Sequence, residues 1–100
     1  MKGTYIIHFD KKAPFAFSRQ YGDRNHYIGY SKEVEDRVKC HLSGIGSAVT
    51  TKMHSLGINM RVGKVYDGVN CEAYLTKANL NEECDICRWG KQQEGVAGHG

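Results

Sequence analysis

Two short runs of β-branched and aromatic residues constrain the fold of this chain more than any other feature. Residues 5–9 read YIIHF and residues 26–30 read HYIGY, and both compositions are typical of β-strands. The intervening residues 10–25 hold the sole proline, Pro14, together with Gly22, Asp23 and a cluster of Lys and Arg. This connection is long for a hairpin, so we expect an exposed loop of the kind that often carries function.

Two helices are predicted after the second strand. Ser31 is a suitable N-cap for the first, acidic residues follow in its first turns, and Gly44 is placed to end it near Ser43. Its apolar stripe repeats at four-residue steps and consists of Val34, Val38 and Leu42. A second, shorter helix is predicted to stop at Gly57, with helical spacing set by Val49, Met53 and Leu56.

The rest of the chain predicts one more strand and one more helix. Residues 58–62 alternate between apolar and polar side chains, and Gly63 interrupts the alternation where a bulge would fit. A turn at Asp67 and Gly68 precedes helical spacing from Asn70 to about Asn79. The expected fold class is therefore α+β, a small three-stranded antiparallel sheet flanked by helices in the order ββααβα.

The length and charge of the chain limit its class. One hundred residues, with 40% hydrophobic and 25% charged, suit one small soluble domain and exclude a multidomain enzyme. We expect that domain over residues 1–89 and a frayed, flexible tail over residues 90–100. Because neither a membrane-spanning stretch nor a secretory signal is evident, we expect a cytoplasmic protein. The net charge of +3 suits a polyanionic partner but is common in proteins that have none.

Four cysteines in such a chain favour free thiols or a metal site over disulfides. Only Cys84 and Cys87 have informative spacing, as a Cys-x-x-Cys pair, which supplies half of a zinc site. Cys40 and Cys71 lie in segments predicted to be helical, far away in the sequence. The pair is therefore predicted to be two ordinary thiols beside a polar turn, and a structural zinc at Cys84 and Cys87 is the disfavoured alternative.

Arg37 and His41 stand four residues apart on the first predicted helix, so they are neighbours on one face beside the apolar stripe. This arrangement holds a cation and an imidazole at the edge of the core. Alone, such a pair is more often a surface arginine beside a partly buried histidine than an active site. Its interpretation depends on the motifs around it.

Those motifs resemble the GIY-YIG nuclease family. Residues 3–5 (GTY) correspond to the family's first motif and residues 27–29 (YIG) to its second, and Arg37 and His41 follow on the next helix. The predicted ββααβα order agrees with the family fold. The IHFD and HYIG phrases and the terminal Cys-x-x-Cys are most similar to small stand-alone bacterial and phage members. Thr4 departs from the family, which usually has isoleucine there, and the loop between the two motifs is longer than usual.

The resemblance implies a metal-dependent endonuclease that hydrolyses DNA phosphodiester bonds, by nicking or structure-dependent cleavage. Glu72 falls at the family's metal-binding glutamate and would hold Mg²⁺ or Mn²⁺ through a hard oxygen ligand. Arg37 would clamp the phosphate with its planar guanidinium, and Tyr27 would hydrogen-bond the phosphate or its water network. Either Tyr5 or His41 would take the proton from water: the resemblance favours Tyr5, and the ordinary pKa of histidine favours His41.

DNA is the expected partner, and its phosphates are predicted to contact exposed basic residues of the long loop. These candidates are Lys11, Lys12, Arg19 and Arg24, with Lys39 and Lys52 as weaker ones. The resemblance adds Gly29 and the polar position Asn79. Two alternatives remain open: a non-catalytic nucleic-acid-binding module of the same fold, and a small zinc-stabilised interaction module built on Cys84 and Cys87. The shape of the DNA substrate, any protein partner and the oligomeric state are also open.

Overall fold

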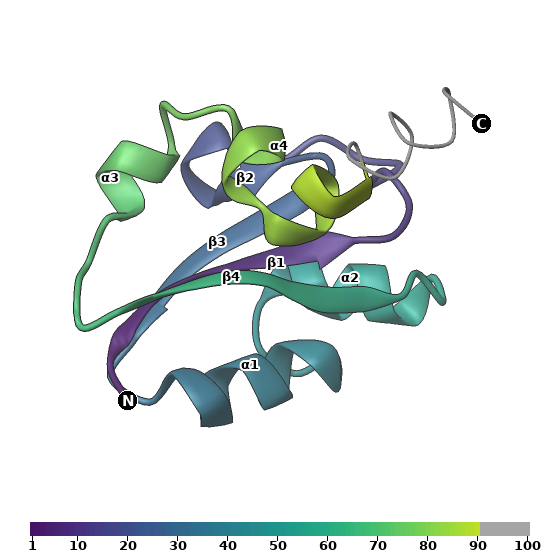
Figure 1. Cartoon of the computed structure of the whole chain (residues 1–100). Coiled ribbons are helices and arrows are strands. Elements are labelled where there is room, and N and C mark those ends of the chain that lie inside the picture. The colour runs from purple at the N-terminus through teal and green to yellow at the C-terminus, as the bar shows by residue number, and fades with distance from the viewer. Residues whose placement is uncertain (91–100) are drawn as a thin grey trace.

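The chain folds around one antiparallel sheet, seen in a computed structural model that describes residues 1–90 (Figure 1). Its four strands lie in the order β2-β3-β1-β4. They are β1 (Gly3–Phe9), β2 (Gly22–Asp23), β3 (His26–Ser31) and β4 (Met60–Asp67). The predicted α+β class is confirmed. The predicted number of three strands is wrong, because the two-residue β2 inside the long loop pairs with β3.

Short helices cover both faces of this sheet (Figure 1). They are α1 (Val34–Leu42), α2 (Ala48–Ser55), α3 (Glu72–Leu75) and α4 (Leu80–Glu83), together with the 3-10 helix η1 (Arg19–Tyr21). Residues 85–90 are also helical. The single helix predicted from Asn70 to Asn79 is wrong, because Asn79 is instead the N-cap of α4. None of the helices in residues 1–90 combines the length and the apolar character needed to cross a membrane.

Strand alternation sends neighbouring side chains to opposite faces of the sheet. On one face, Tyr5, Ile7 and Phe9 of β1 pack with side chains of α1 and α2, including Val38 and Met53. On the other face, a second cluster joins the sheet to α3 and α4, and it consists of Ile6, Ile28, Leu75 and Leu80. Both faces of β1 are therefore buried, and each face positions its own group of polar residues.

Two irregularities shape the sheet and its long loop. The register of β1 and β4 shifts between Ile6 and Ile7, where Gly63 is the extra residue, which confirms the predicted bulge. The 10–25 loop folds back on itself, because the amide of buried Ala13 donates to the carbonyl of Arg24 at 2.7 Å. Of the tail predicted over residues 90–100, only Gly90 is described, and it is helical; residues 91–100 lie outside the described part of the chain.

Candidate functional site

A buried tyrosine–histidine pair lies between the sheet and α1. Tyr5 of β1 and His41 of α1 are 2% and 0% exposed, and the Tyr5 hydroxyl lies 2.8 Å from His41 Nε2. The other ring nitrogen, Nδ1, lies 2.8 Å from the hydroxyl of Thr50 on α2. Both His41 nitrogens are therefore occupied, and the ring is fixed between the first strand and the second helix.

Two glycines leave the space that this pair occupies. Gly29 faces Tyr5 across the β1–β3 pairing, and a Cβ on Gly29 would collide with the hydroxyl end of the Tyr5 ring. A Cβ on Gly46 would likewise collide with Nδ1 of His41. In this geometry Gly29 has a packing role, because it lets the Tyr5 ring lie close over β3. Its role in binding nucleic acid stays a prediction.

The environment of the pair changes the acidity of both groups. Burial, with the nearby positive charge of Arg37, lowers the pKa of His41 to about 4, so the imidazole is neutral at pH 7. Burial is also the main cause that raises the pKa of Tyr5 to about 12, with further contributions from Tyr27 and Glu72. A neutral histidine has one donor and one acceptor nitrogen. With the hydrogen on Nδ1, His41 accepts a hydrogen bond from the Tyr5 hydroxyl at Nε2.

Arg37 lies at the solvent edge of this pair. Its guanidinium donates to the carbonyl of Gly46 at 2.9 Å, which holds the side chain over the α1–α2 connection. Its charge acts on both Tyr5 and His41, since it favours the ionised form of the phenol and disfavours protonation of the imidazole. Arg37 and His41 are therefore neighbours on α1, as predicted.

Tyr27 connects the buried pair to solvent. Its ring centroid lies 5.0 Å from that of His41, and its outer face stacks on Tyr21 with centroids 6.5 Å apart. Tyr27 and Tyr21 line an open cavity of about 310 Å³ with the first turn of α2. A second cavity, of about 330 Å³, lies beyond Tyr21 and is lined by Glu72. Tyr21 thus lines both cavities, the one beside Tyr27 and the one beside Glu72.

The sheet itself positions the start of α3, and hence Glu72. The hydroxyl of buried Thr4 donates to the carbonyl of Val69 at 2.7 Å and accepts from the amide of Cys71 at 2.9 Å. Thr4, the departure from the family's first motif, therefore fixes the segment just before Glu72. Glu72 is half-buried and is the first residue of α3. Isoleucine at position 4 would supply neither hydrogen bond.

The structure gives the predicted DNA-contacting residues mixed environments. Lys11, Lys12, Arg19 and Arg24 are all exposed, as expected. Arg19, however, donates to the carbonyls of Leu75 and Ala78, and Arg24 donates to that of Ala13. Lys52 lies over the Phe15 ring at 4.5 Å. The side chain of Asn79 accepts from the amide of Asn81, so its local role is to cap α4.

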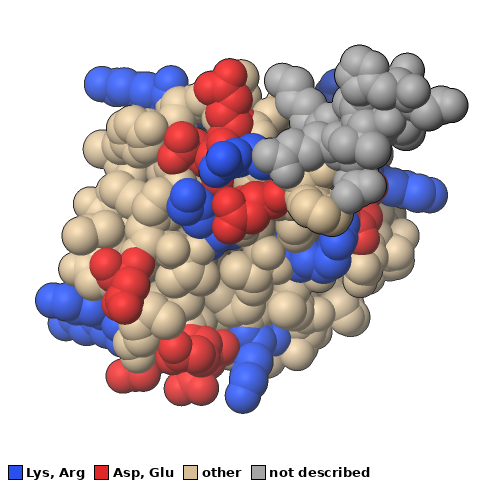
Figure 2. Space-filling model, in the orientation of Figure 1, with Lys and Arg blue, Asp and Glu red and all other residues tan. Residues whose placement is uncertain are grey.

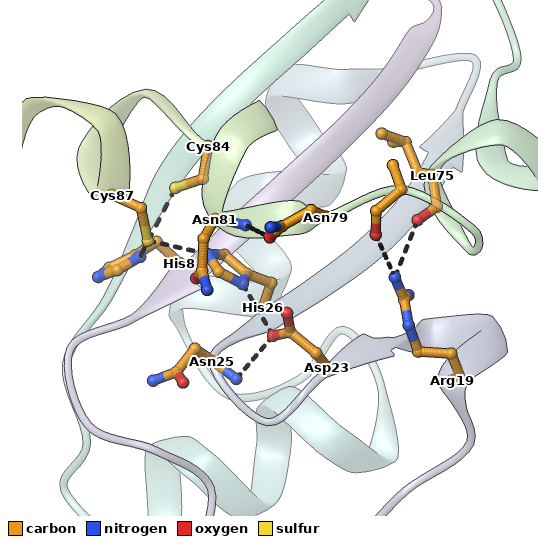
Figure 3. A network of polar contacts seen from close by, with 11 residues as sticks. His8, Arg19, Asp23, Asn25, His26, Leu75, Asn79, Asn81, Cys84 and Cys87 are labelled. Atoms are coloured by element: carbon orange, nitrogen blue, oxygen red, sulfur yellow. Dashed lines mark hydrogen bonds and ion pairs between the residues drawn. The ribbon is translucent and has the colours of Figure 1, made fainter. Parts of the chain in front are cut away.

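A second cluster of polar residues lies on the opposite face of the sheet, around His8, His26, Cys84 and Cys87 (Figure 3). One donor atom from each residue lies within 4.8 Å of the others, so the group can bind a metal such as zinc. Cys84 and Cys87, which were predicted to be ordinary thiols beside a polar turn, thus lie in a group that could hold a metal ion. The cysteine pair supplies two of the four side chains, and His8 of β1 and His26 of β3 supply the other two.

The four side chains of this cluster shift one another's acidity in different directions: burial and the neighbouring Cys84 raise the pKa of the Cys87 thiol to about 12. Burial opposes ionisation of Cys84, but contacts with the two histidines outweigh it and lower the pKa of the Cys84 thiol to about 5. Burial likewise opposes charge on His26, and the hydrogen bond with Asp23 reverses the effect and raises the pKa of His26 to about 9. Within residues 1–90, this is the one group of three or more His, Cys, Asp or Glu residues that could hold a metal ion.

Sequence reasoning missed the two histidines because they are distant from the cysteines along the chain. The structure pairs His8 with His26 across β1 and β3, in a register that the composition of the two predicted strands does not determine. Comparisons with protein-family models, with curated proteins and with solved structures found no match to this chain. Its function is therefore inferred from the residues themselves.

Proposed function

We propose that the protein is a metal-dependent endonuclease whose active site lies around Tyr5, Tyr27, Arg37, His41 and Glu72. The observation that carries the proposal is the buried Tyr5–His41 hydrogen bond of 2.8 Å, placed directly behind a solvent-facing tyrosine and beside an arginine. Strongly perturbed pKa values such as those of Tyr5 and His41 cluster at functional sites. The GIY-YIG resemblance assigns the same residues to hydrolysis of DNA.

Each demand of phosphodiester hydrolysis has a candidate group. The planar guanidinium of Arg37, held by the carbonyl of Gly46 just before α2, suits the non-bridging phosphate oxygens, and the first turn of α2, which lines the cavity beside Tyr27, adds a favourable dipole for an anion. Glu72 provides one carboxylate, which suits Mg²⁺ or Mn²⁺ because these ions keep several waters and bind the phosphate directly. Such an ion supplies charge neutralisation when bound.

Tyr5 and His41 are assigned to positioning the attacking water. Water forms the new bond to phosphorus and loses its proton to solvent, while the Tyr5 oxygen accepts a hydrogen bond from that water and keeps its own proton in the hydrogen bond to His41 Nε2. The bond from phosphorus to the leaving deoxyribose oxygen breaks, and that oxygen takes a proton from solvent. His41 is a positioning residue in this scheme, since Tyr5 and Thr50 occupy its two ring nitrogens.

The test is cleavage of supercoiled plasmid and of labelled duplex, flap and branched DNA, with and without added Mg²⁺ or Mn²⁺. Omission of the ion is preferable to a chelator, because a chelator would also remove a metal ion held by His8, His26, Cys84 and Cys87. Glu72→Gln and Arg37→Lys are each expected to lower the rate about 100-fold. Exposed matched controls, Glu82→Gln and Arg88→Lys, should cut like the wild type.

Two outcomes would reject the endonuclease assignment. If the wild type binds these DNAs but never cuts them, the fold serves as a non-catalytic nucleic-acid-binding module. If it neither binds nor cuts but carries zinc, the alternative of a zinc-stabilised interaction module is favoured instead.

A further inference from the structure

We propose that His8, His26, Cys84 and Cys87 bind one structural zinc ion, which fastens the carboxyl-terminal helices to the sheet on the face opposite Tyr5. The distances fit this assignment. His26 Nε2 lies 3.2 Å from Cys87 Sγ, and His8 Nδ1 lies 3.5 Å from Cys87 Sγ and 3.6 Å from Cys84 Sγ. Zn–S bonds of about 2.3 Å and Zn–N bonds of about 2.0 Å at tetrahedral angles separate sulfur from nitrogen by about 3.5 Å.

The sheet register presents the two histidines together. His8 and His26 are partners across the β1–β3 pairing, and their rings meet edge to face with centroids 5.4 Å apart. Strand alternation puts both on the face opposite Tyr5 and Tyr27. The zinc ligands and the proposed active site thus share two strands and lie on opposite faces of them.

Both imidazoles have a carboxylate behind the nitrogen that does not face sulfur. Asp23 Oδ1 lies 2.8 Å from Nδ1 of His26 (Figure 3), and Asp10 Oδ1 lies 3.6 Å from Nε2 of His8. Asp10 is itself held by Arg61 at 2.6 Å. Metal-binding histidines are oriented in this way, because the outer partner fixes the tautomer and leaves the other nitrogen free to ligate. The contact with Asp23 is within hydrogen-bond distance and so indicates a ligand role for His26, whereas Asp10 lies close to His8 without a hydrogen bond to it.

The chain also leaves room for the sulfurs. Gly63, the bulged residue of β4, lies under Cys84, and a Cβ there would approach Cys84 Sγ to 2.7 Å. Cys84 and His26 are fully buried, and His8 and Cys87 are half-buried. With four protein ligands in a closed setting, the site lacks the open position that a catalytic zinc needs.

The proposed zinc has a clear structural task. α3 and α4 have four residues each, which is too short for a helix to be stable without tertiary contacts. Leu75 and Leu80 alone among their residues are fully buried against the sheet. A metal at Cys84 and Cys87 adds a bond to β1 and β3 directly after α4, and so holds this face closed.

The experiment measures metal in the full chain purified without chelator. About one zinc per chain is expected in the wild type and in Cys40→Ala, a matched control outside the cluster. Cys87→Ala should lose it. Replacement by Co²⁺ should give the visible bands of tetrahedral cobalt with thiolate ligands. Because the Co²⁺ spectrum of the wild type needs no variant, it tests the site even if Cys87→Ala fails to fold.

Two further variants distinguish this zinc from a metal ion bound elsewhere on the chain. Asp23→Asn should weaken zinc binding by about 10-fold to 100-fold in competition with a chromogenic chelator, whereas the exposed Asp85→Asn should not. Glu72→Gln should keep its zinc, which distinguishes this site from the proposed catalytic ion. Absence of zinc from the wild type together with a failure to take up Co²⁺, or full zinc content in Cys87→Ala, would overturn the proposal.

Discussion

At the scale of residues, the molecule holds polar groups by making room for them. The Tyr5 ring can extend to His41 because Gly29 has no side chain. Cys84 can pack closely against β4 because Gly63 has no side chain. Neither glycine has a positive φ, so the reason for glycine at both positions is space and not backbone conformation. Substitution at these positions therefore tests the two sites separately.

Gly29→Ala should displace the Tyr5 ring and destabilise the fold by about 1–3 kcal/mol, because the added methyl group collides with the hydroxyl end of the ring. Urea unfolding measures the change. Gly90→Ala is the matched control, since a Cβ at Gly90 meets no other part of residues 1–90 within 4 Å. Equal midpoints for the two variants would show that Tyr5 does not depend on the space above β3.

His41 predicts a loss of stability in mild acid. Its pKa is about 4 in the folded chain, against 6.5 ordinarily, so the unfolded chain binds a proton that the folded chain excludes. Stability from this group is fully present above pH 6.5 and falls as the pH drops toward 4, by up to about 3 kcal/mol. The titratable groups around it are Tyr5, Tyr27 and Arg37.

Unfolding free energies at several pH values, for the wild type and His41→Gln, measure this effect. Other titrating groups contribute equally to both proteins, so the wild-type curve should be steeper between pH 6.5 and 4. Parallel curves would mean that His41 is not buried in its neutral form.

At the level of helices and strands, a sequence pattern predicts elements with a repeating apolar spacing and misses elements of only a few residues. The strand runs at residues 5–9 and 26–30, the helices α1 and α2 and the bulge at Gly63 lie where expected, but Leu42 and Leu56 of the predicted apolar stripes are 37% and 50% exposed. β2 was missed because two residues show no alternation. The division into α3 and α4 was missed because a capping asparagine, Asn79, resembles any polar helix residue until its side chain is seen to accept from Asn81.

The candidate sites follow the same rule. Arg37 and His41 were predictable as neighbours because helical spacing relates them, whereas the hydrogen bond between His41 and Tyr5 joins residues 36 positions apart. The cysteine cluster needs ligands from β1, β3 and the segment after α4. Such a site becomes visible only when strand register is known.

The connection from β4 to α3 gives an element-scale prediction. Thr4→Val keeps the shape of the side chain but removes its hydrogen bonds with Val69 and Cys71. The variant should lose about 1–3 kcal/mol and should loosen the start of α3, where Glu72 lies. Hydrogen exchange of the α3 amides measures the loosening. Unchanged protection of those amides would show that Glu72 is placed by other contacts.

At the scale of the whole molecule, the sheet divides two chemistries. One face carries α1, α2 and the Tyr5–His41 pair; the other carries α3, α4 and the His–Cys cluster. Lys and Arg are interspersed with Asp and Glu over the face shown in Figure 2, instead of forming a single basic patch there. We therefore expect DNA affinity to come from a few phosphate contacts and to fall as salt rises.

The proposed activity depends on the claim that the Tyr5 hydroxyl takes part in phosphodiester hydrolysis. The most direct test is single-turnover cleavage of labelled branched DNA in Mg²⁺ by the wild type, Tyr5→Phe and Tyr30→Phe. Tyr30 is a half-buried tyrosine on the same strand as Tyr27 but on the opposite face of the sheet, which makes it the matched control. We predict a rate about 100-fold lower for Tyr5→Phe at unchanged zinc content, and a wild-type rate for Tyr30→Phe. Cleavage by Tyr5→Phe at the wild-type rate would contradict the claim.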